Sequence, residues 1–496
     1  MRGRDTWVLL ATVLGSSLAF IDSTVVTLAL PSIQREFHAS AGDVAWIIEL
    51  YTLVLGSLML LGGALADRLG RKRTFVVGCT LFAAGSVGCA FAWSIPSILA
   101  ARVLQGMGGM LFAPASLAIL GAHFTGDARS RAVGTWSAFT ALTSTLGPML
   151  GGVLIDSLGW RSVFWINIPL AALVIAAALR HISESRDDNA PSRLDWLGAG
   201  LATSGLAAIT YGLILASSAG WRDPAVAGSV IAGIAVLLLF GAHEGRSRAP
   251  LVPPDLFNSR TFAAINVATL LLYGATGGLF YETPFAMIQS HGYTALEAAL
   301  GSLPMAIGLI ALSRFAAPAL AKRIGVRATL SLGPAIVTCG ALLLALLEPQ
   351  PSYWVAFFPG IAVVGIGMGI TVAPLTNAVI GAATPRHVGI ASGINTAVAR
   401  VAALLAIAAL TVVLAATYDR SIAQELDAIH AAPAIRAEVA AQRDRLGGAH
   451  FGRPQIQRAS IDAFNAGYRS VAIACAFLAA LAALADALGI DESTLR

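Results

Sequence analysis

The ionisable residues that we single out inside long apolar runs of the sequence are Asp22, Glu49, Arg102, Glu282 and Arg400, the last without an assigned partner. A charged side chain in the hydrocarbon interior of a bilayer is costly, so each of these residues is a candidate for function by default. A carboxyl group in apolar surroundings binds or releases a proton when a neighbouring guanidinium moves or a cationic ligand arrives. The chemistry that these residue types predict is proton binding.

The positions of the first four of these residues along their apolar runs place them at comparable depths. Asp22 lies about eight residues, and Arg102 about six, from the predicted outer end of its run. At about 1.5 Å per residue, these depths are roughly 12 Å and 9 Å. Glu49 and Glu282 are shallower but lie on the same side, so all four are candidates to converge on an outward-facing half-cavity. The alternatives are a static Asp22–Arg102 ion pair that only fixes helix register, and Glu49 and Glu282 at helix ends that face water.

The composition indicates an integral membrane protein. Of 496 residues, 57% are hydrophobic and 12% are charged, about half the charged share of a soluble domain. The apolar residues form runs of about 20, the length that crosses a bilayer core as a helix. We predict fourteen such spans, near residues 7–30, 44–66, 74–93, 96–120, 132–155, 161–180, 195–216, 224–243, 261–285, 295–317, 328–347, 353–375, 388–415 and 470–488.

The distribution of Lys and Arg predicts the orientation of these spans. Short loops on one side collect most of the cations, whereas those on the other side carry only Arg35, Arg161 and Arg222. The cation-rich side of a membrane protein is cytoplasmic, so both termini are predicted inside, in a bacterial plasma (inner) membrane. The cations are spread over many loops without a basic helix face, which argues against nucleic acid as a partner.

A basic turn that occurs twice indicates an internal duplication. The turn at 65–73 returns at 320–328 with matching Leu, Ala, Arg and Gly positions. Repeats of this kind build transporters from two related bundles. We predict an all-α fold of two six-helix bundles, residues 1–180 and 261–496, with linkers and an inserted two-helix hairpin in 181–260. Within the second bundle, 416–469 is predicted as a long outer loop, either a solvated helical hairpin or an element of gating or partner binding.

Glycines in the fifth predicted span form a second motif. Gly147 and Gly151 are four residues apart on one helix face, with Pro148 and Gly152 beside them. Small residues at this spacing let two helices approach closely, and the proline removes one backbone hydrogen bond. A hinge or sealing contact between bundles is predicted, and ordinary close packing is the alternative.

These residues together resemble the Major Facilitator Superfamily, specifically its fourteen-span drug:proton antiporter branch. The resemblance rests on five motifs in order along the chain, at 22–31, 63–73, 102–109, 147–152 and 159–169. It implies alternating access by two rocking bundles, with Asp22 and Arg102 in proton coupling. It also implies a cytoplasmic gate that comprises Gly63, Asp67, Arg68, Gly70, Arg71 and Lys72. Glu49 and Glu282 depart from the family pattern and are expected to favour cationic drugs.

The sequence therefore predicts proton-coupled efflux of lipophilic, preferably cationic, drugs or toxic small molecules. No G-x-x-x-x-G-K-[ST] loop and no H-E-x-x-H motif occurs, which argues against ATP as the energy source and against a membrane enzyme. We expect a monomer that works without a cofactor or metal, driven by the proton gradient. The alternative is a dedicated exporter of one endogenous metabolite, antibiotic or lipid.

Overall fold

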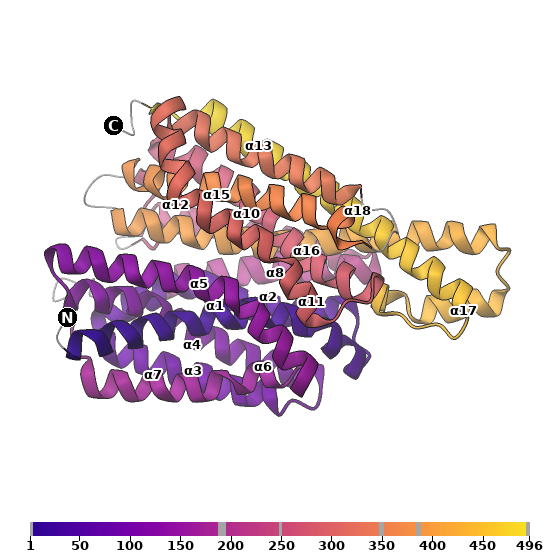
Figure 1. The fold of residues 1–496 in the computed structure, drawn as a ribbon, viewed down its shortest axis with the longest axis horizontal. Helices are drawn as coiled ribbons and strands as arrows, with labels where there is room; N and C mark the ends of the chain where they lie inside the picture. Colours follow the sequence, from indigo (N-terminus) through magenta and orange to yellow (C-terminus); the bar gives the residue numbers. More distant parts are fainter. Residues whose placement is uncertain (1–2, 187–194, 248–249, 347–351, 383–387, 493–496) are drawn as a thin grey trace. The chain divides into compact units, whose positions relative to one another are not determined.

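The computed structural model describes residues 3–186, 195–247, 250–346, 352–382 and 388–492, and every element in these ranges is a helix. Helices satisfy their own backbone hydrogen bonds, which a bilayer interior requires. In chain order (Figure 1) they are α1 (Gly3–Phe37), α2 (Ala41–Leu69), α3 (Arg71–Ala90), α4 (Ile95–His123), α5 (Gly126–Leu158), α6 (Ser162–Trp165), α7 (Asn167–His181), α8 (Trp196–Ala219), α9 (Pro224–Glu244), η1 (Pro254–Asn258), α10 (Arg260–Phe285), η2 (Ala286–Ser290), α11 (Ala295–Gly301), α12 (Leu303–Ile324), α13 (Val326–Ala345), α14 (Tyr353–Ala356), α15 (Phe358–Gly381), α16 (Val388–Ala428), α17 (Pro433–Ala441), η3 (Arg443–Gly448) and α18 (Pro454–Gly489).

Thirteen helices in the described part of the chain are long and apolar enough to cross a membrane. The remaining predicted span, 132–155, falls in the 33-residue helix α5. Several side chains of α5 lie outside the described residues, and its apolar stretch Gly147–Leu158 is shorter than a membrane span. The prediction of an all-helical, multi-pass membrane protein is confirmed, and the count of fourteen spans stays a prediction.

The chain forms two compact units, which we describe separately. The first comprises Met1–Ile33, Trp46–Ala208 and Ala232–Leu251, and the second comprises Gln34–Ala45, Ile209–Ile231 and Val252–Arg496. The predicted inserted helices correspond to α8 and α9, and the boundary between the units divides both of them. The boundaries at 180 and 260 therefore stay predictions.

Glycines hold one helix pair together in each unit. In the first, a Cβ added at Gly78 of α3 would lie 2.8 Å from the Gly108 carbonyl oxygen of α4. In the second, a Cβ at Gly340 of α13 would lie 2.9 Å from the Gly360 carbonyl oxygen of α15. Such distances leave no room for a side chain, so glycine is what allows these backbones to touch. The same packing solution in both units agrees with the duplication seen in the sequence.

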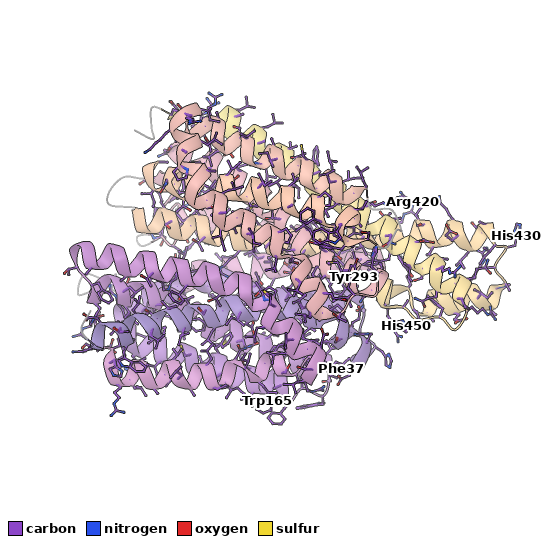
Figure 2. The ribbon with its side chains drawn as sticks, in the orientation of Figure 1. Phe37, Trp165, Tyr293, Arg420, His430 and His450 are labelled. Atoms are coloured by element: carbon purple, nitrogen blue, oxygen red, sulfur yellow. The ribbon has the colours of Figure 1, made fainter. Side chains whose placement is uncertain are left out.

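The segment 416–469 of the second unit is a helical hairpin, as the first of the two predicted alternatives has it. The span predicted at 388–415 continues as helix α16 to Ala428, and the span predicted at 470–488 begins at Pro454 as α18. Both helices run past the other helices of their unit and carry α17 near the tip (Figure 1). Arg443 Nε donates to Asp419 Oδ1 over 2.7 Å and ties the return of the hairpin to α16. Figure 2 marks the hairpin by Arg420, His430 and His450.

Candidate functional site

Asp22 and Arg102 form a buried ion pair in the first unit. Asp22 lies in the middle of α1 and Arg102 in the second turn of α4, and their side chains are both 0% exposed. Arg102 Nη1 donates to Asp22 Oδ2 over 2.5 Å. The structure thus brings together the two residues that the sequence singled out first.

Three further polar side chains surround Asp22. Gln105 Nε2 donates to Asp22 Oδ1 over 3.0 Å, and Asn167 Nδ2 donates to the same oxygen over 3.2 Å. The amides of Gln105 and Asn167 also donate to Ser86 Oγ, over 2.9 Å and 3.3 Å. The site therefore draws on α1, α3, α4 and α7, and all its polar members are buried.

Arg102 is held from several sides. Its Nε donates to the Ile47 carbonyl oxygen over 2.8 Å, and its Nη1 also donates to Gln105 Oε1 over 2.7 Å. Its Cζ lies 4.3 Å from the centre of the Tyr51 ring, in the geometry of a cation–π contact. Its Nη2 is buried without a hydrogen-bond partner among the described residues. A buried nitrogen donor without an acceptor is unfavourable, so a rearrangement that gives Nη2 an acceptor would be stabilising.

The arrangement favours the ionised form of Asp22. Its two oxygens accept from three N–H donors, and an ionised carboxylate is an acceptor only. The three donors take up three of the roughly four lone-pair positions of the carboxylate and leave one on Oδ2.

Glu49 lies in the same unit but outside this network. It sits on α2 with 0% exposure, and neither carboxyl oxygen has a hydrogen-bond partner among the described residues. Leaving a bare carboxylate in a buried apolar site is strongly unfavourable, so the neutral, protonated form fits this environment. The alternative that Glu49 faces water at a helix end is wrong for this conformation.

Glu282 lies on α10 in the second unit and is 5% exposed. It lines a small cavity together with Phe285, Thr411 and Phe464. The alternative of a water-facing helix end is wrong for this residue too. Because Glu282 belongs to the other unit, the predicted convergence of all four ionisable groups on one half-cavity stays a prediction.

The return segment of the hairpin lines this cavity. Arg445 and Leu446 line it, and the Arg445 carbonyl oxygen accepts from Gln34 Nε2 over 3.1 Å. Gln289 Nε2 in turn donates to Gln34 Oε1 over 2.9 Å. Leu446 has a φ of 50°, in a region that non-glycine residues rarely occupy. The predicted outer loop thus packs against the end of α10 near Glu282.

The predicted cytoplasmic gate is a compact turn in the first unit. Arg71 donates to Asp67 Oδ1 through Nε and Nη2, over 2.9 Å and 2.7 Å. Gly70, between α2 and α3, has a φ of 112°, which L side chains rarely adopt. Arg68 is exposed at the end of α2, and a Cβ at Gly63 would meet Pro114 Cβ at 3.6 Å.

A glutamate that the sequence analysis did not single out caps α3. Glu184 accepts from the Lys72 and Arg73 backbone N–H groups over 3.0 Å and 3.1 Å, and Lys72 Nζ donates to the Leu179 carbonyl oxygen over 2.8 Å. A carboxylate at a helix N-terminus satisfies free N–H groups and the helix dipole. A Cβ on Gly70 would come within 2.7 Å of the Glu184 carboxyl, so glycine is required there on both counts.

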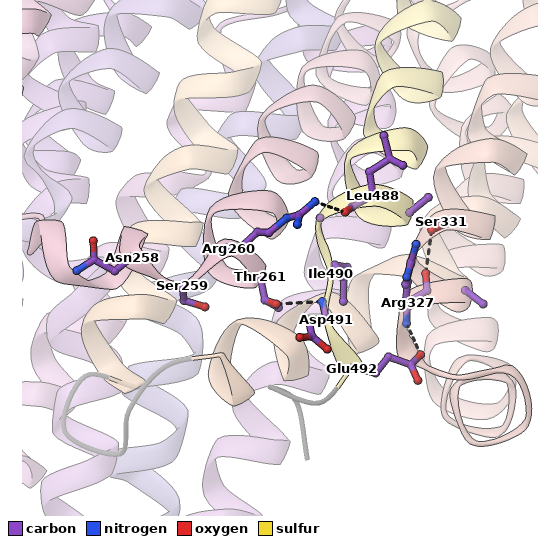
Figure 3. Close-up of a pocket in the computed structure, with 13 residues that line it drawn as sticks. Asn258, Ser259, Arg260, Thr261, Arg327, Ser331, Leu488, Ile490, Asp491 and Glu492 are labelled. Carbon is purple, nitrogen blue, oxygen red and sulfur yellow. Dashed lines mark hydrogen bonds between the residues drawn. The ribbon is translucent and has the colours of Figure 1, made fainter.

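The second unit repeats this cap (Figure 3). Glu492 Oε1 accepts from the Arg327 N–H over 3.1 Å at the start of α13, next to Gly325 with a φ of 89°. Asp491 N donates to Thr261 Oγ1 over 3.1 Å, which fixes the chain end against α10. The sequence signal is an Ile-x-Glu tripeptide just after α7 and just after α18, at 182–184 and 490–492.

The glycine motif of α5 lies against α1 beside the ion pair. A Cβ on Gly147 would lie 3.0 Å from Thr24 Oγ1, and one on Gly151 would lie 2.3 Å from Val25 Cγ1. Pro148 and Gly152 lie within the same helix, which continues through them. The contact is close helix packing, the alternative raised above. A hinge or a seal between bundles stays a prediction.

Sequence reasoning did not single out Asp486, a buried acid of the second unit. Asp486, near the end of α18, is 0% exposed, and neither carboxyl oxygen has a hydrogen-bond partner among the described residues. It also missed Gln105, Asn167 and Ser86, because amide and hydroxyl side chains are common in membrane helices. Asp486 could have been found as the one acid in the apolar run 470–488.

Comparison with known proteins places the chain among transporters. The model of the Major Facilitator Superfamily matches residues 12–407. The methylenomycin A resistance protein of Bacillus subtilis (strain 168) is 33% identical over 404 residues, with 81% of this chain and 86% of the relative covered. The multidrug resistance protein Stp of Mycobacterium tuberculosis (strain CDC 1551 / Oshkosh) is 31% identical over 420 residues, covering 84% and 78%. A bacterial homologue of the human lysosomal transporter Spinster shares the fold with a TM-score of 0.69 at 18% identity, covering 98% of each chain.

Proposed function

We propose that this chain, which belongs to the Major Facilitator Superfamily, exports lipophilic small molecules across a bacterial plasma membrane in exchange for protons. Relatives named for antibiotic and multidrug resistance support efflux as the direction of transport. The observation that carries the proposed coupling is the Asp22–Arg102 pair with its two amide partners, all buried. A static structural pair would need no unused guanidinium nitrogen, whereas Arg102 Nη2, with its two N–H groups, has no partner among the described residues.

The proposed mechanism divides the acids into two kinds. Asp22 accepts from three donors and is the group whose proton uptake we propose to be coupled to a change in its contact with Arg102. Glu49 and Glu282 lie buried, and each holds a proton until water or a cationic substrate reaches it. Proton entry from outside would weaken the Asp22–Arg102 contact and favour the conformation that reloads substrate from the cytoplasm. No cofactor takes part, and the proton gradient supplies the energy.

A dedicated exporter is the second candidate. The relative from Bacillus subtilis is named for resistance to methylenomycin A alone, which favours a narrow substrate range. The relative from Mycobacterium tuberculosis is named for multidrug resistance, which favours a broad one. The buried acids Glu49 and Glu282 favour cationic substrates, so we propose the broad range with a preference for cations.

Transport by reconstituted protein tests the proposal. Wild type, Asp22→Asn and Asp462→Asn are each reconstituted into vesicles. A proton gradient is imposed, and uptake of a cationic and a neutral dye is measured. Asp462 is an exposed acid of α18 and serves as the matched control. We expect gradient-driven dye movement in wild type and the control, its collapse with a protonophore, and a loss of at least tenfold in Asp22→Asn. A rate of dye uptake that does not depend on the proton gradient in any of the three proteins would refute proton coupling.

A further inference from the structure

An aromatic pocket lies at the end of the second unit where α10 passes through η2 into α11. Its volume is about 390 Å³, within the range of small-molecule sites. Tyr293, Tyr353, Trp354 and Phe358 line it together with Glu297. Figure 2 labels Tyr293 at this end of the unit. The orientation predicted from the loop charges places the pocket at the outer membrane surface.

The aromatic wall is a packed cluster. The rings of Tyr353, Trp354 and Phe358 lie 5.1 to 6.2 Å apart, centre to centre, and are tilted or edge-on to each other. Tyr353 is fixed at its far end, because its hydroxyl donates to the Gly301 carbonyl oxygen over 2.8 Å. A Cβ on Gly301 would lie 3.1 Å from that ring, so the absence of a side chain at Gly301 lets the Tyr353 ring pack there. The wall is therefore built before any ligand arrives.

The pocket carries a single sign of charge. Among the described residues, Glu297 is the one charged side chain that lines it. Its Oε2 accepts from the Thr294 N–H over 2.8 Å in a capping box at the start of α11. That bond fixes the carboxylate and leaves acceptor capacity on its second oxygen. An exposed carboxylate beside preformed aromatic faces is complementary to a cation.

The pocket also opens to the surface of the unit. Trp354 is 68% exposed. Leu300 lines the same pocket and is 40% exposed. An aromatic belt at a membrane surface explains tryptophans at helix ends, but it explains neither a hollow of this size nor a carboxylate on its rim.

We propose that this pocket binds lipophilic organic cations, through the faces of Tyr353, Trp354 and Phe358 and the carboxylate of Glu297. Two sources share this chemistry: soluble onium compounds and the ammonium headgroup of phosphatidylethanolamine. The site goes beyond the proposed transport reaction, because its occupancy is measurable without any transport.

A thiol reporter in the pocket separates this site from every other one. The four cysteines are free, and only Cys339 is exposed. In a Cys339→Ser background, Leu300→Cys reports the pocket, and Leu346→Cys, exposed beyond the end of α13, is the matched control. Full-length protein in nanodiscs of phosphatidylglycerol is labelled with a maleimide, with tetraphenylphosphonium or neutral triphenylphosphine oxide present.

We expect tetraphenylphosphonium to slow labelling of Leu300→Cys at least fivefold and to leave Leu346→Cys unchanged. Glu297→Gln keeps the capping box, since Gln also serves at that position, and should raise the half-protecting concentration about tenfold. Trp354→Ala removes an exposed ring and should raise it severalfold. Glu425→Gln, at an exposed acid of α16, should not change it.

Equal protection by the neutral compound, or unchanged protection in Glu297→Gln, would overturn the proposal. Adding phosphatidylethanolamine to the nanodiscs identifies the source of the cation. A higher half-protecting concentration assigns the pocket to the lipid ammonium, and an unchanged one assigns it to soluble cations. Loss of dye transport with protection intact would refute the proposed function alone.

Discussion

Two buried acids, Asp22 in the first unit and Asp486 in the second, differ in their hydrogen-bond partners. Asp22 accepts hydrogen bonds from Arg102, Gln105 and Asn167. Asp486 is equally buried within the protein, and neither of its carboxyl oxygens has a hydrogen-bond partner in the described part of the chain. Glu282 is also buried, in a small cavity under the outer hairpin.

The difference teaches that burial alone does not define the charge of an acid. A carboxylate that accepts from a guanidinium and two amides is stable as an anion in a buried site. A carboxyl group without donors avoids most of the desolvation cost only as the neutral acid. The two kinds of site therefore differ in their donors: Asp22 has three, whereas Asp486, and Glu49 in the first unit, have none among the described residues.

Removal of the guanidinium should have the largest effect on stability. Arg102→Met leaves Asp22 as an uncompensated buried charge, so we expect a loss of about 3–5 kcal/mol. The double variant Arg102→Met/Asp22→Asn should recover most of that loss, since the charge is then gone as well. Thermal or denaturant unfolding of purified protein measures both. A single variant as stable as the double one would show that Asp22 is not ionised in the folded state.

Loss of an amide partner should cost less. Asn167→Leu keeps a similar volume and removes one donor to the buried carboxylate, so we expect a loss of about 1.5–3 kcal/mol. Asn266→Leu is the matched control in the second unit, where the amide donates to the Phe262 carbonyl oxygen and accepts from Asn395 Nδ2, both neutral groups. The same unfolding measurement applies. Equal losses would mean that the carboxylate adds nothing to the Asn167 contact.

Removal of the capping glutamate should destabilise the two units by similar amounts. Glu184→Ala and Glu492→Ala each remove the acceptor at the start of a helix, α3 or α13. We expect a similar loss of about 1 kcal/mol for each. Hydrogen exchange at the Lys72 and Arg327 amides should report the loss locally. A strongly unequal effect would show that the duplicated cap has acquired different roles in the two units.

Neutral replacements of the unpaired acids should have the smallest effect. Asp486→Asn and Glu49→Gln imitate the protonated acids in shape and charge, so we expect changes in unfolding free energy within about 0.5 kcal/mol. Asp22→Asn serves as the contrast, because it removes a paired charge and should destabilise the protein clearly. If Asp486→Asn destabilises as much as Asp22→Asn, then Asp486 has an ionic partner in the native state.

Hydropathy and charge along the sequence determined the architecture. Runs of about 20 apolar residues specify membrane helices because each helix satisfies its own backbone, whatever its neighbours are. The repeated basic turns marked the duplication, and the rise per residue placed Asp22 and Arg102 at similar depths. All of these are local properties of the chain, so the sequence suffices for them.

Only the tertiary structure decided which side chains meet. Asn167 is 145 residues from Asp22, and Ser86 is 81 residues from Asn167. Whether such residues touch depends on the rotation of each helix about its axis, which nearly uniform apolar spans do not encode. The same holds for Glu184 and Glu492, which reach helix starts more than 100 residues away. The depth of a residue in a membrane follows from the sequence of its own helix, whereas a hydrogen bond between helices depends on how two helices pack.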